Sequence, residues 1–373
     1  MDNRKKLFTR RDPYKNNDQL REAFLAATRS ELSHHIKNCP EYARIAEKQG
    51  FRPDDIRTEA DLAKIPVIPT LYLKRNRLFS VPESELAVRA SSSGTKGSAS
   101  TVGIDKKSLS LGMRMMTRFF SYHKVISLIP CNYVILSYEP GATDLGAAKT
   151  AYGTSKFAPA LHREYCLKAV NGKYELNIEG VQKALLRYAK SPFPVRFVGF
   201  PAYMYFLARS LRDRGVSLKL NKKSMVILGG GWKQFSGEEI GREAFCALIN
   251  ETLGIGRERV LEFYSAAEHP LAYARCSCGH FHVPAYSRVI IRSAYDLSPV
   301  ENGQTGLLSF VSPLVHSMPI TSVVTDDLAV YSDEPCGCGN PAPYFDLIGR
   351  AGVSGITTCA AAAAETLGKG AAK

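Results

Sequence analysis

Apolar side chains divide the chain into stretches of different periodicity. Over residues 17–37 they recur at the three- and four-residue spacing of one helix face. The apolar positions of this stretch are Leu20, Phe24, Leu25, Leu32 and Ile36. The spacing predicts an amphipathic helix that packs against the rest of the protein.

Between about residues 130 and 265, short apolar or β-branched runs alternate with segments of helical periodicity. In chain order these are YVILSY, VQKALLRYAK, VRFVGF, YMYFLARSLRDRG, SMVILGGG and RVLEFY. Alternating strands and helices are typical of an α/β domain built on a parallel sheet. The central part of the chain is therefore predicted to have this fold class.

After residue 270 the pattern changes to successive short strands separated by turns rich in Gly, Pro, Asn and Asp. An appended β subdomain is expected here. The chain would then consist of an N-terminal helical segment (1–90), an α/β nucleotide- and acyl-binding core (91–270), the β subdomain (271–347) and a C-terminal tail (348–373).

Composition agrees with a globular protein. With 45% hydrophobic residues, a chain of 373 residues can bury a sizeable core. It has no uninterrupted apolar run of about 18 residues, and its basic start lacks the apolar segment of a secretory signal. We therefore expect a cytoplasmic protein without a membrane span.

The charge balance favours anionic partners or substrates. Lys and Arg number 49 against 35 Asp and Glu, a net charge of +14. Apart from RKK and RR near the start, the basic residues are scattered, and no zinc-finger, RNP or GxxG-loop signature accompanies them. Nucleic-acid binding is therefore not expected.

The densest local signal is SSSGTKGSAST, residues 91–101, which follows a strand-like segment. Glycines let backbone N–H groups approach a phosphate closely, and hydroxyls and a lysine add further donors. The residues that would contact phosphate are Ser92, Ser93, Gly94, Thr95, Lys96 and Gly97. The Walker spacing is absent, and a Ser/Gly-rich stretch taken alone is also typical of a flexible linker.

Two further segments carry polar side chains beside apolar strands. In LEFYSAAEHP, Tyr264 can stack on adenine and Glu268 can hold Mg²⁺ at the end of a strand. In VVTDDLAVYSD, Asp326 and Asp327 are expected at a strand entrance, where they can accept hydrogen bonds from ribose hydroxyls. The plainer interpretations are a buried tyrosine with a surface glutamate, and a turn.

In this order, the segments resemble the adenylate-forming superfamily of acyl-CoA synthetases and its phenylacetate-CoA ligase branch. SSGTKG resembles the phosphate loop, YSAAE the Tyr-x-x-x-Glu motif, TDDL the ribose-binding Thr-Gly-Asp, and IGR (348–350) the Gly-Arg near the hinge. The resemblance implies ATP and Mg²⁺ as cofactors. It assigns Thr95 and its neighbours to the phosphates, Tyr264 and Ser265 to the nucleotide, Glu268 to magnesium, and Asp327 and Arg350 to ribose.

The runs ILGGGWK (227–233), IPVIPTLYLK (65–74) and GHFHVP (279–284) resemble one branch, the acyl-protein synthetases of LuxE type. That branch feeds a bacterial fatty acid reductase, which implies a fatty acid substrate and an acyl-accepting reductase or similar partner. Gly230 and Gly231 would line the nucleotide and acyl pocket, although a simple strand-to-helix turn explains them too. Lys96, Ala99 and Asp326 depart from the superfamily pattern.

The C-terminal tail contains the candidate acyl acceptor. Acyl-CoA synthetases continue past the hinge Gly-Arg into a mobile domain with a catalytic lysine, whereas 23 residues follow Arg350 here, so the full domain is expected to be missing. Thr358 is a candidate helix N-cap, which puts Cys359 in the first turn of a short Ala-rich helix. The helix dipole favours a nucleophilic thiolate there. A docked apolar cysteine is the alternative.

A second cysteine pattern suggests a structural metal. Cys276-x-Cys278-Gly and Cys336-x-Cys338-Gly are two similar knuckles that together can make a four-thiolate zinc site. His280 or His282 can replace one thiolate, and reduced buried cysteines are the alternative.

The sequence thus predicts an ATP-dependent ligase that forms an acyl-adenylate and transfers the acyl group to a thiol. Two alternatives stay open: a compact CoA ligase in which Cys359 is incidental, and a non-catalytic nucleotide-binding partner protein.

Overall fold

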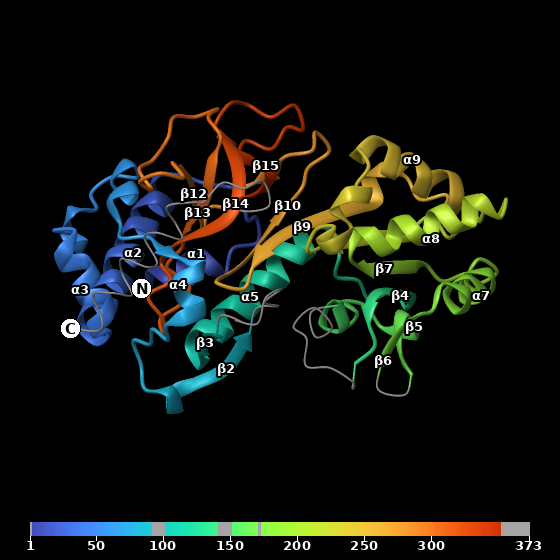
Figure 1. The fold of residues 1–373 in the computed structure, drawn as a ribbon, viewed down its shortest axis with the longest axis horizontal. Helices are drawn as coiled ribbons and strands as arrows, with labels where there is room; N and C mark the ends of the chain where they lie inside the picture. The colour runs from blue at the N-terminus through green and yellow to red at the C-terminus, as the bar shows by residue number, and fades with distance from the viewer. Residues whose placement is uncertain (1, 92–100, 141–150, 171–172, 352–373) are drawn as a thin grey trace. The chain divides into compact units, whose positions relative to one another are not determined.

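The computed structural model describes residues 2–91, 101–140, 151–170 and 173–351 (Figure 1). Its internal contacts divide the chain into two units. The first comprises residues 1–122, 266–273 and 280–373, and the second comprises residues 123–265 and 274–279. Helices and strands occur in both units, which confirms the α/β class.

Helices of the first unit come mainly from the N-terminal part of the chain. They are α1 (Asn3–Phe8), α2 (Asp18–Asn38), α3 (Pro40–Lys48), α4 (Thr70–Arg75) and α5 (Lys106–Tyr122), with short 3-10 turns at Pro53–Asp55, Ala60–Lys64 and Glu83–Glu85. The predicted helix at 17–37 is confirmed as α2. It begins after Asn17, whose side chain accepts a hydrogen bond from the backbone N–H of Leu20.

A mostly antiparallel sheet forms the C-terminal part of this unit. Its strands are β11 (Phe281–His282), β12 (Arg288–Arg292), β13 (Gly306–Val311), β14 (Ser322–Ser332) and β15 (Tyr344–Arg350), in the order β11-β15-β14-β13-β12. The short β1 (Ile68–Pro69) pairs in parallel with β14, and β2 (Leu86–Ser91) forms a hairpin with β3 (Thr101–Asp105). The predicted β strands after residue 270 are confirmed.

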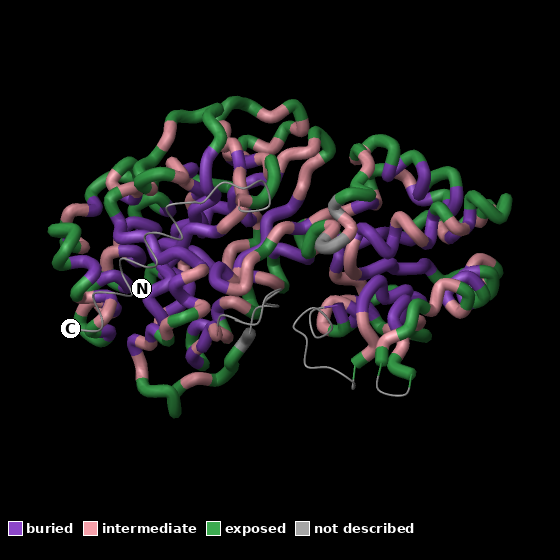
Figure 2. Tube along the Cα trace, viewed as in Figure 1, coloured by how far each residue is buried: buried purple, intermediate pink, exposed green. Residues whose placement is uncertain are grey.

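The second unit is built on parallel strands. These are β4 (Cys131–Tyr138), β5 (Ala160–Val170), β7 (Val195–Gly199), β8 (Met225–Gly229) and β9 (Val260–Ala266), with β6 (Lys173–Leu176) antiparallel at one edge. With β10 (His269–Ala274), the sheet order is β10-β9-β8-β7-β4-β5-β6. Central strands are buried along their length (Figure 2), as parallel strands usually are.

Three helices pack on this sheet through one apolar core: α7 (Ile178–Tyr188), α8 (Pro201–Asp213) and α9 (Arg242–Leu253), while 3-10 turns occupy Lys233–Glu238 and Arg257–Arg259. Pro201 starts α8, and Gly254 ends α9 with φ 66°. The alternation of strand and helix patterns predicted between residues 130 and 265 is confirmed. It brings the loops after β7 and β8 to the same edge of the sheet.

Candidate active site and metal centre

In the first unit, Asp327 and Arg350 form a cross-strand pair. They are directly opposite each other in the β14–β15 ladder, and Nε of Arg350 lies 4.0 Å from Oδ1 of Asp327. Both side chains reach solvent, with exposed fractions of 29% and 55%. A carboxylate beside a guanidinium at an accessible strand can bind a pair of hydroxyl groups such as those of ribose.

Asp326 and Asp327 lie in the middle of β14, so the expectation of a strand entrance was wrong. The local backbone explains the position. The hydroxyl of Thr325 accepts a hydrogen bond from the backbone N–H of Asp327 at 3.2 Å, and the ladder is irregular between Leu328 and Ala329. The irregularity bends the strand beside the Asp327–Arg350 pair. Thr325 is the first residue of the TDDL segment, which resembles the ribose-binding motif.

Glu268 is buried in the turn between β9 and β10, with 6% of its surface exposed. The next residue, His269, begins a hydrogen-bonded chain: its Nε2 lies 2.7 Å from the Tyr273 hydroxyl, which lies 2.6 Å from Oγ of Ser287. The His269 ring also stacks on Phe310. Burial lowers the pKa of His269 to about 3, so the imidazole is neutral at physiological pH. These hydrogen bonds between His269, Tyr273 and Ser287 hold the backbone in place next to Glu268.

In the second unit, four predicted site residues lie at the carboxyl ends of two parallel strands, β8 and β9. Gly230 and Gly231 come directly after β8 with φ 82° and 66°, a left-handed conformation that favours glycine. Tyr264 and Ser265 lie within the last part of β9, and Ser265 is exposed. Carboxyl ends of parallel strands are where open α/β sheets bind ligands.

Two groups of predicted site residues lie outside the described part of the chain. The phosphate-loop residues Ser92, Ser93, Gly94, Thr95, Lys96 and Gly97 belong to 92–100, and Cys359 belongs to 352–373. Their assignments remain predictions.

The two cysteine knuckles contribute to one cluster. The ligand atoms of Cys276, His282, Cys336 and Cys338 all lie within 4.8 Å of one another. Cys278, which was predicted as the fourth ligand, is exposed and is not a member of the cluster. His282 takes its place, because β11 pairs with β15 in a register that sets His282 opposite Tyr344, close to the Cys336–Cys338 turn.

Hydrogen bonds around the cluster orient its donors. Nδ1 of His282 lies 2.7 Å from the Ala342 carbonyl oxygen, and Nε2 lies 3.2 Å from Sγ of Cys338. The backbone N–H of Asn340 donates to the same sulfur at 3.4 Å. A histidine that donates one N–H to a carbonyl presents the other nitrogen to a metal in the correct tautomer. Three sulfurs and one imidazole nitrogen match the donor set of tetrahedral structural zinc.

The remaining described cysteines have a different environment. Cys39, Cys131, Cys166 and Cys246 are buried, and burial raises the pKa of each thiol, to about 12 for Cys166. None of these four is suited to act as a nucleophile. Among the described residues, no helix is long and apolar enough to cross a membrane.

Comparisons with known proteins show which folds and sequences the chain is similar to. In fold, the chain is similar to 2-hydroxyisobutyryl-CoA ligase in the postadenylation state, with a TM-score of 0.64 at 17% identity over 91% of this chain and 70% of that one. In sequence, it is 23% identical over 340 residues to the long-chain-fatty-acid–luciferin-component ligase of Vibrio harveyi, across 88% of this chain and 83% of that protein. It is also 32% identical over 326 residues to the phenylacetate-coenzyme A ligase of Pseudomonas putida, across 83% of this chain and 66% of that protein.

The fold therefore places the protein among proteins built like adenylate-forming ligases. The family model of acyl-protein synthetase, LuxE, matches residues 7–368, and the chain belongs to this family. It is an enzyme, an ATP-dependent ligase that activates an acid.

Proposed function

We propose that the protein activates a fatty acid with Mg·ATP and transfers the acyl group to the thiol of Cys359. The observation that carries the proposal is the extent of the family match, which runs from residue 7 to 368 and so includes Cys359. The ligases of Vibrio harveyi and Aliivibrio fischeri, both named for long-chain fatty acids, support the choice of acid.

In the first step, an oxygen of the substrate carboxylate attacks the α-phosphorus of ATP. The bond from that phosphorus to the bridging oxygen breaks, and pyrophosphate leaves with the bond electrons. The Asp327–Arg350 pair would bind the ribose hydroxyls, and Tyr264 would stack on adenine. Bound Mg²⁺ neutralises phosphate charge. Glu268, with its backbone fixed beside His269, would hold this ion.

In the second step, the thiolate of Cys359 attacks the carbonyl carbon of the acyl-adenylate. The carbon–oxygen bond to the phosphate breaks, AMP leaves as the anion, and the thiol proton passes to solvent. The product is an acyl-thioester on the protein. A thioester keeps the acyl group activated, so we infer that a reductase or similar partner protein accepts it.

We further propose that Cys276, His282, Cys336 and Cys338 hold a structural zinc ion. The donor set and the Nδ1 hydrogen bond of His282 to Ala342 support this assignment. Because all four positions of a tetrahedral ion would be filled by protein, the ion would supply stability to the β11–β15 region and take no part in acyl transfer.

Intact-mass spectrometry tests the proposed acceptor. The protein is incubated with Mg·ATP and a series of fatty acids, and wild type is compared with Cys359→Ser and with Cys278→Ser. Cys278 is the matched control because it is an exposed cysteine outside the metal cluster. We expect a hydroxylamine-labile acyl adduct on wild type and on Cys278→Ser, and none on Cys359→Ser.

The competing acceptor is coenzyme A, which the phenylacetate-coenzyme A ligase of Pseudomonas putida uses according to its name. AMP release that requires added CoA, together with no protein adduct on wild type, would replace Cys359 by CoA as the acceptor. Failure of the protein to exchange pyrophosphate with ATP in the presence of any fatty acid would reject a fatty acid as the substrate.

A further inference from the structure

The parallel sheet of the second unit has a cavity at the amino ends of its strands. Gly230 and Tyr264 lie at the other ends of the strands, the carboxyl ends. The cavity has a volume of about 360 Å³, and it is lined by Asn132, Leu161, His162, Arg187, Tyr188, Ser191 and Phe193. Asn132 is at the amino end of β4 and pairs with His162 of β5 and with Val195, the first residue of β7. The cavity therefore sits at the amino ends of three adjacent strands, whereas α/β ligand sites lie at the carboxyl ends.

The inner wall of this cavity carries an amide with an unmet hydrogen-bonding need. Asn132 is 2% exposed, and its Oδ1 has no hydrogen-bond partner among the described residues. Leaving a buried polar atom without a partner costs about 1–3 kcal/mol. An apolar residue at this position of β4 would avoid that cost. Because Asn132 is one of the residues that line the cavity, its amide can offer a hydrogen-bond acceptor to a molecule that binds there.

The walls are apolar and aromatic. The rings of His162 and Tyr188 are nearly parallel, with an interplanar angle of 10° and centroids 6.2 Å apart. Leu161 and Phe193 add apolar surface that is unusually accessible, 42% and 36% exposed. Single exposed apolar residues are ordinary, but here they converge on one cavity of ligand size. Such walls suit a flat aromatic molecule.

One cation lies at the rim. Arg187, in the last turn of α7, is exposed and lines the cavity. A planar guanidinium binds a carboxylate through two parallel hydrogen bonds. The cavity thus offers an inner acceptor, aromatic walls and an outer cation.

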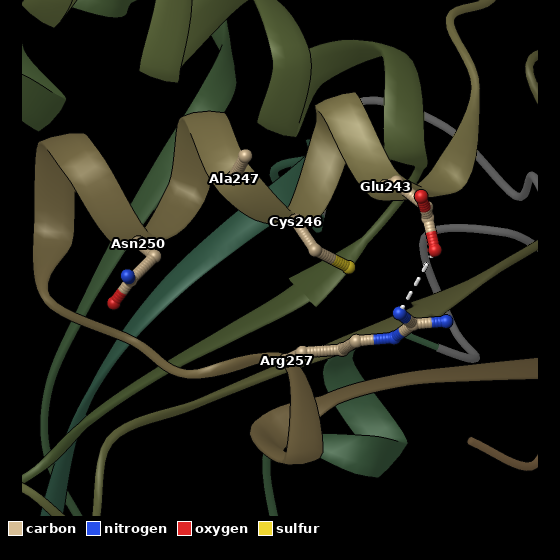
Figure 3. A pocket seen from close by; sticks show the side chains of 5 residues that line it. All are labelled: Glu243, Cys246, Ala247, Asn250 and Arg257. Atoms are coloured by element: carbon tan, nitrogen blue, oxygen red, sulfur yellow. Dashed lines mark hydrogen bonds and ion pairs between the residues drawn. The ribbon is translucent and has the colours of Figure 1, made fainter.

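Another cavity in this unit shows the contrast. It has a volume of about 340 Å³ and lies beside α9. In Figure 3, a dashed line joins Glu243 and Arg257, two residues of its lining. They form an ion pair in which Nη1 of Arg257 lies 3.1 Å from Oε1 of Glu243. The charged groups there already satisfy one another, and its buried Cys246 has a raised pKa, so nothing in that lining requires a ligand.

We propose that the Asn132 cavity binds a small aromatic carboxylate that carries a hydroxyl group, at a site separate from the adenylation site. The hydroxyl would donate to Oδ1 of Asn132, the ring would lie against Tyr188 and Phe193, and the carboxylate would pair with Arg187. The site would let the enzyme respond to an aromatic acid that it does not activate.

The test is titration calorimetry with 4-hydroxybenzoate, and with benzoate and phenol as probes that each lack one recognised group. Wild type is compared with Asn132→Leu, Arg187→Gln and the control Arg212→Gln. Arg212 lies in the last turn of the adjacent helix α8, outside the cavity lining. We expect saturable binding of 4-hydroxybenzoate, roughly tenfold weaker in the first two variants and unchanged in the third, with benzoate and phenol also weaker.

The titration is repeated with the adenylation site filled by a non-hydrolysable acyl-adenylate analogue. Binding that persists supports a separate site, and binding that the analogue displaces overturns it. The proposal is also overturned by no saturable binding to wild type, or by binding that Asn132→Leu and Arg187→Gln leave unchanged. If Asn132→Leu does not fold, Arg187→Gln decides, because an exposed position tolerates the change.

Discussion

Arg350 faces Asp327 directly across the β14–β15 ladder, with Nε 4.0 Å from Oδ1 of the carboxylate. Both side chains are accessible, and exposed ion pairs contribute only about 0–1 kcal/mol to stability. The pair therefore contributes little to the fold, and its position suits the recognition of a polar ligand.

Changing Asp327→Asn should raise KM for ATP about tenfold or more, because a charge-assisted hydrogen bond to ribose is worth about 1.5–3 kcal/mol. The melting midpoint should stay the same. Exchange of labelled pyrophosphate into ATP measures the effect. The exposed Glu334→Gln, just after β14, is the control and should leave KM unchanged. An unaltered KM in Asp327→Asn would remove this residue from the nucleotide site.

Changing His282→Ala should remove zinc from the purified protein, because the imidazole supplies one of four clustered donors. Metal analysis should find close to one zinc per chain in wild type and in the control Cys278→Ser. At a free zinc concentration one hundred times the Kd of the site, bound zinc adds about 2.7 kcal/mol to the free energy of unfolding. A variant that cannot bind zinc should lose this contribution. Two results together would contradict the zinc assignment. Wild-type protein would contain no metal after purification, and adding zinc would not change its free energy of unfolding.

Stability should fall in acid because of His269. Burial lowers its pKa from an ordinary 6.5 to about 3, so between these values the unfolded chain binds a proton that the folded chain does not. This contribution to the free energy of unfolding is complete above pH 6.5. It is lost progressively as pH falls toward 3, by several kcal/mol in total.

Urea unfolding at a series of pH values measures this slope. The variant His269→Phe should be less stable at pH 7, because it loses the hydrogen bond to Tyr273, but its stability should fall less steeply between pH 6.5 and 3. Equal slopes in wild type and His269→Phe would show that His269 titrates normally.

Changing Gly199→Ala should destabilise the second unit by about 1–3 kcal/mol. The residue ends β7 with φ 142°, and an added Cβ would collide with the Leu136 carbonyl of the neighbouring strand. Denaturant unfolding provides the measurement. Gly237→Ala is the matched control, since a Cβ there meets nothing within 4 Å. Comparable losses in both variants would argue that backbone crowding is not the cause.

Local sequence determined a large part of this protein. The helix at 18–38, the alternation of strands and helices before residue 265 and the strands after it all follow from apolar periodicity, which is a property of neighbouring residues. The short motifs around Tyr264 and Asp327 also indicated an adenylating ligase, through their resemblance to the motifs of that superfamily and their order along the chain.

Tertiary structure decided the relationships between distant residues. Two Cys-x-Cys knuckles predicted a metal cluster, but only the register of β11 with β15 selects His282 over Cys278. In the same way, the pairing of β14 with β15 sets Arg350 opposite Asp327, and the pairing of β4 with β5 buries Asn132 beside His162. Strand register depends on packing across the whole sheet, so no local pattern along the chain encodes these contacts.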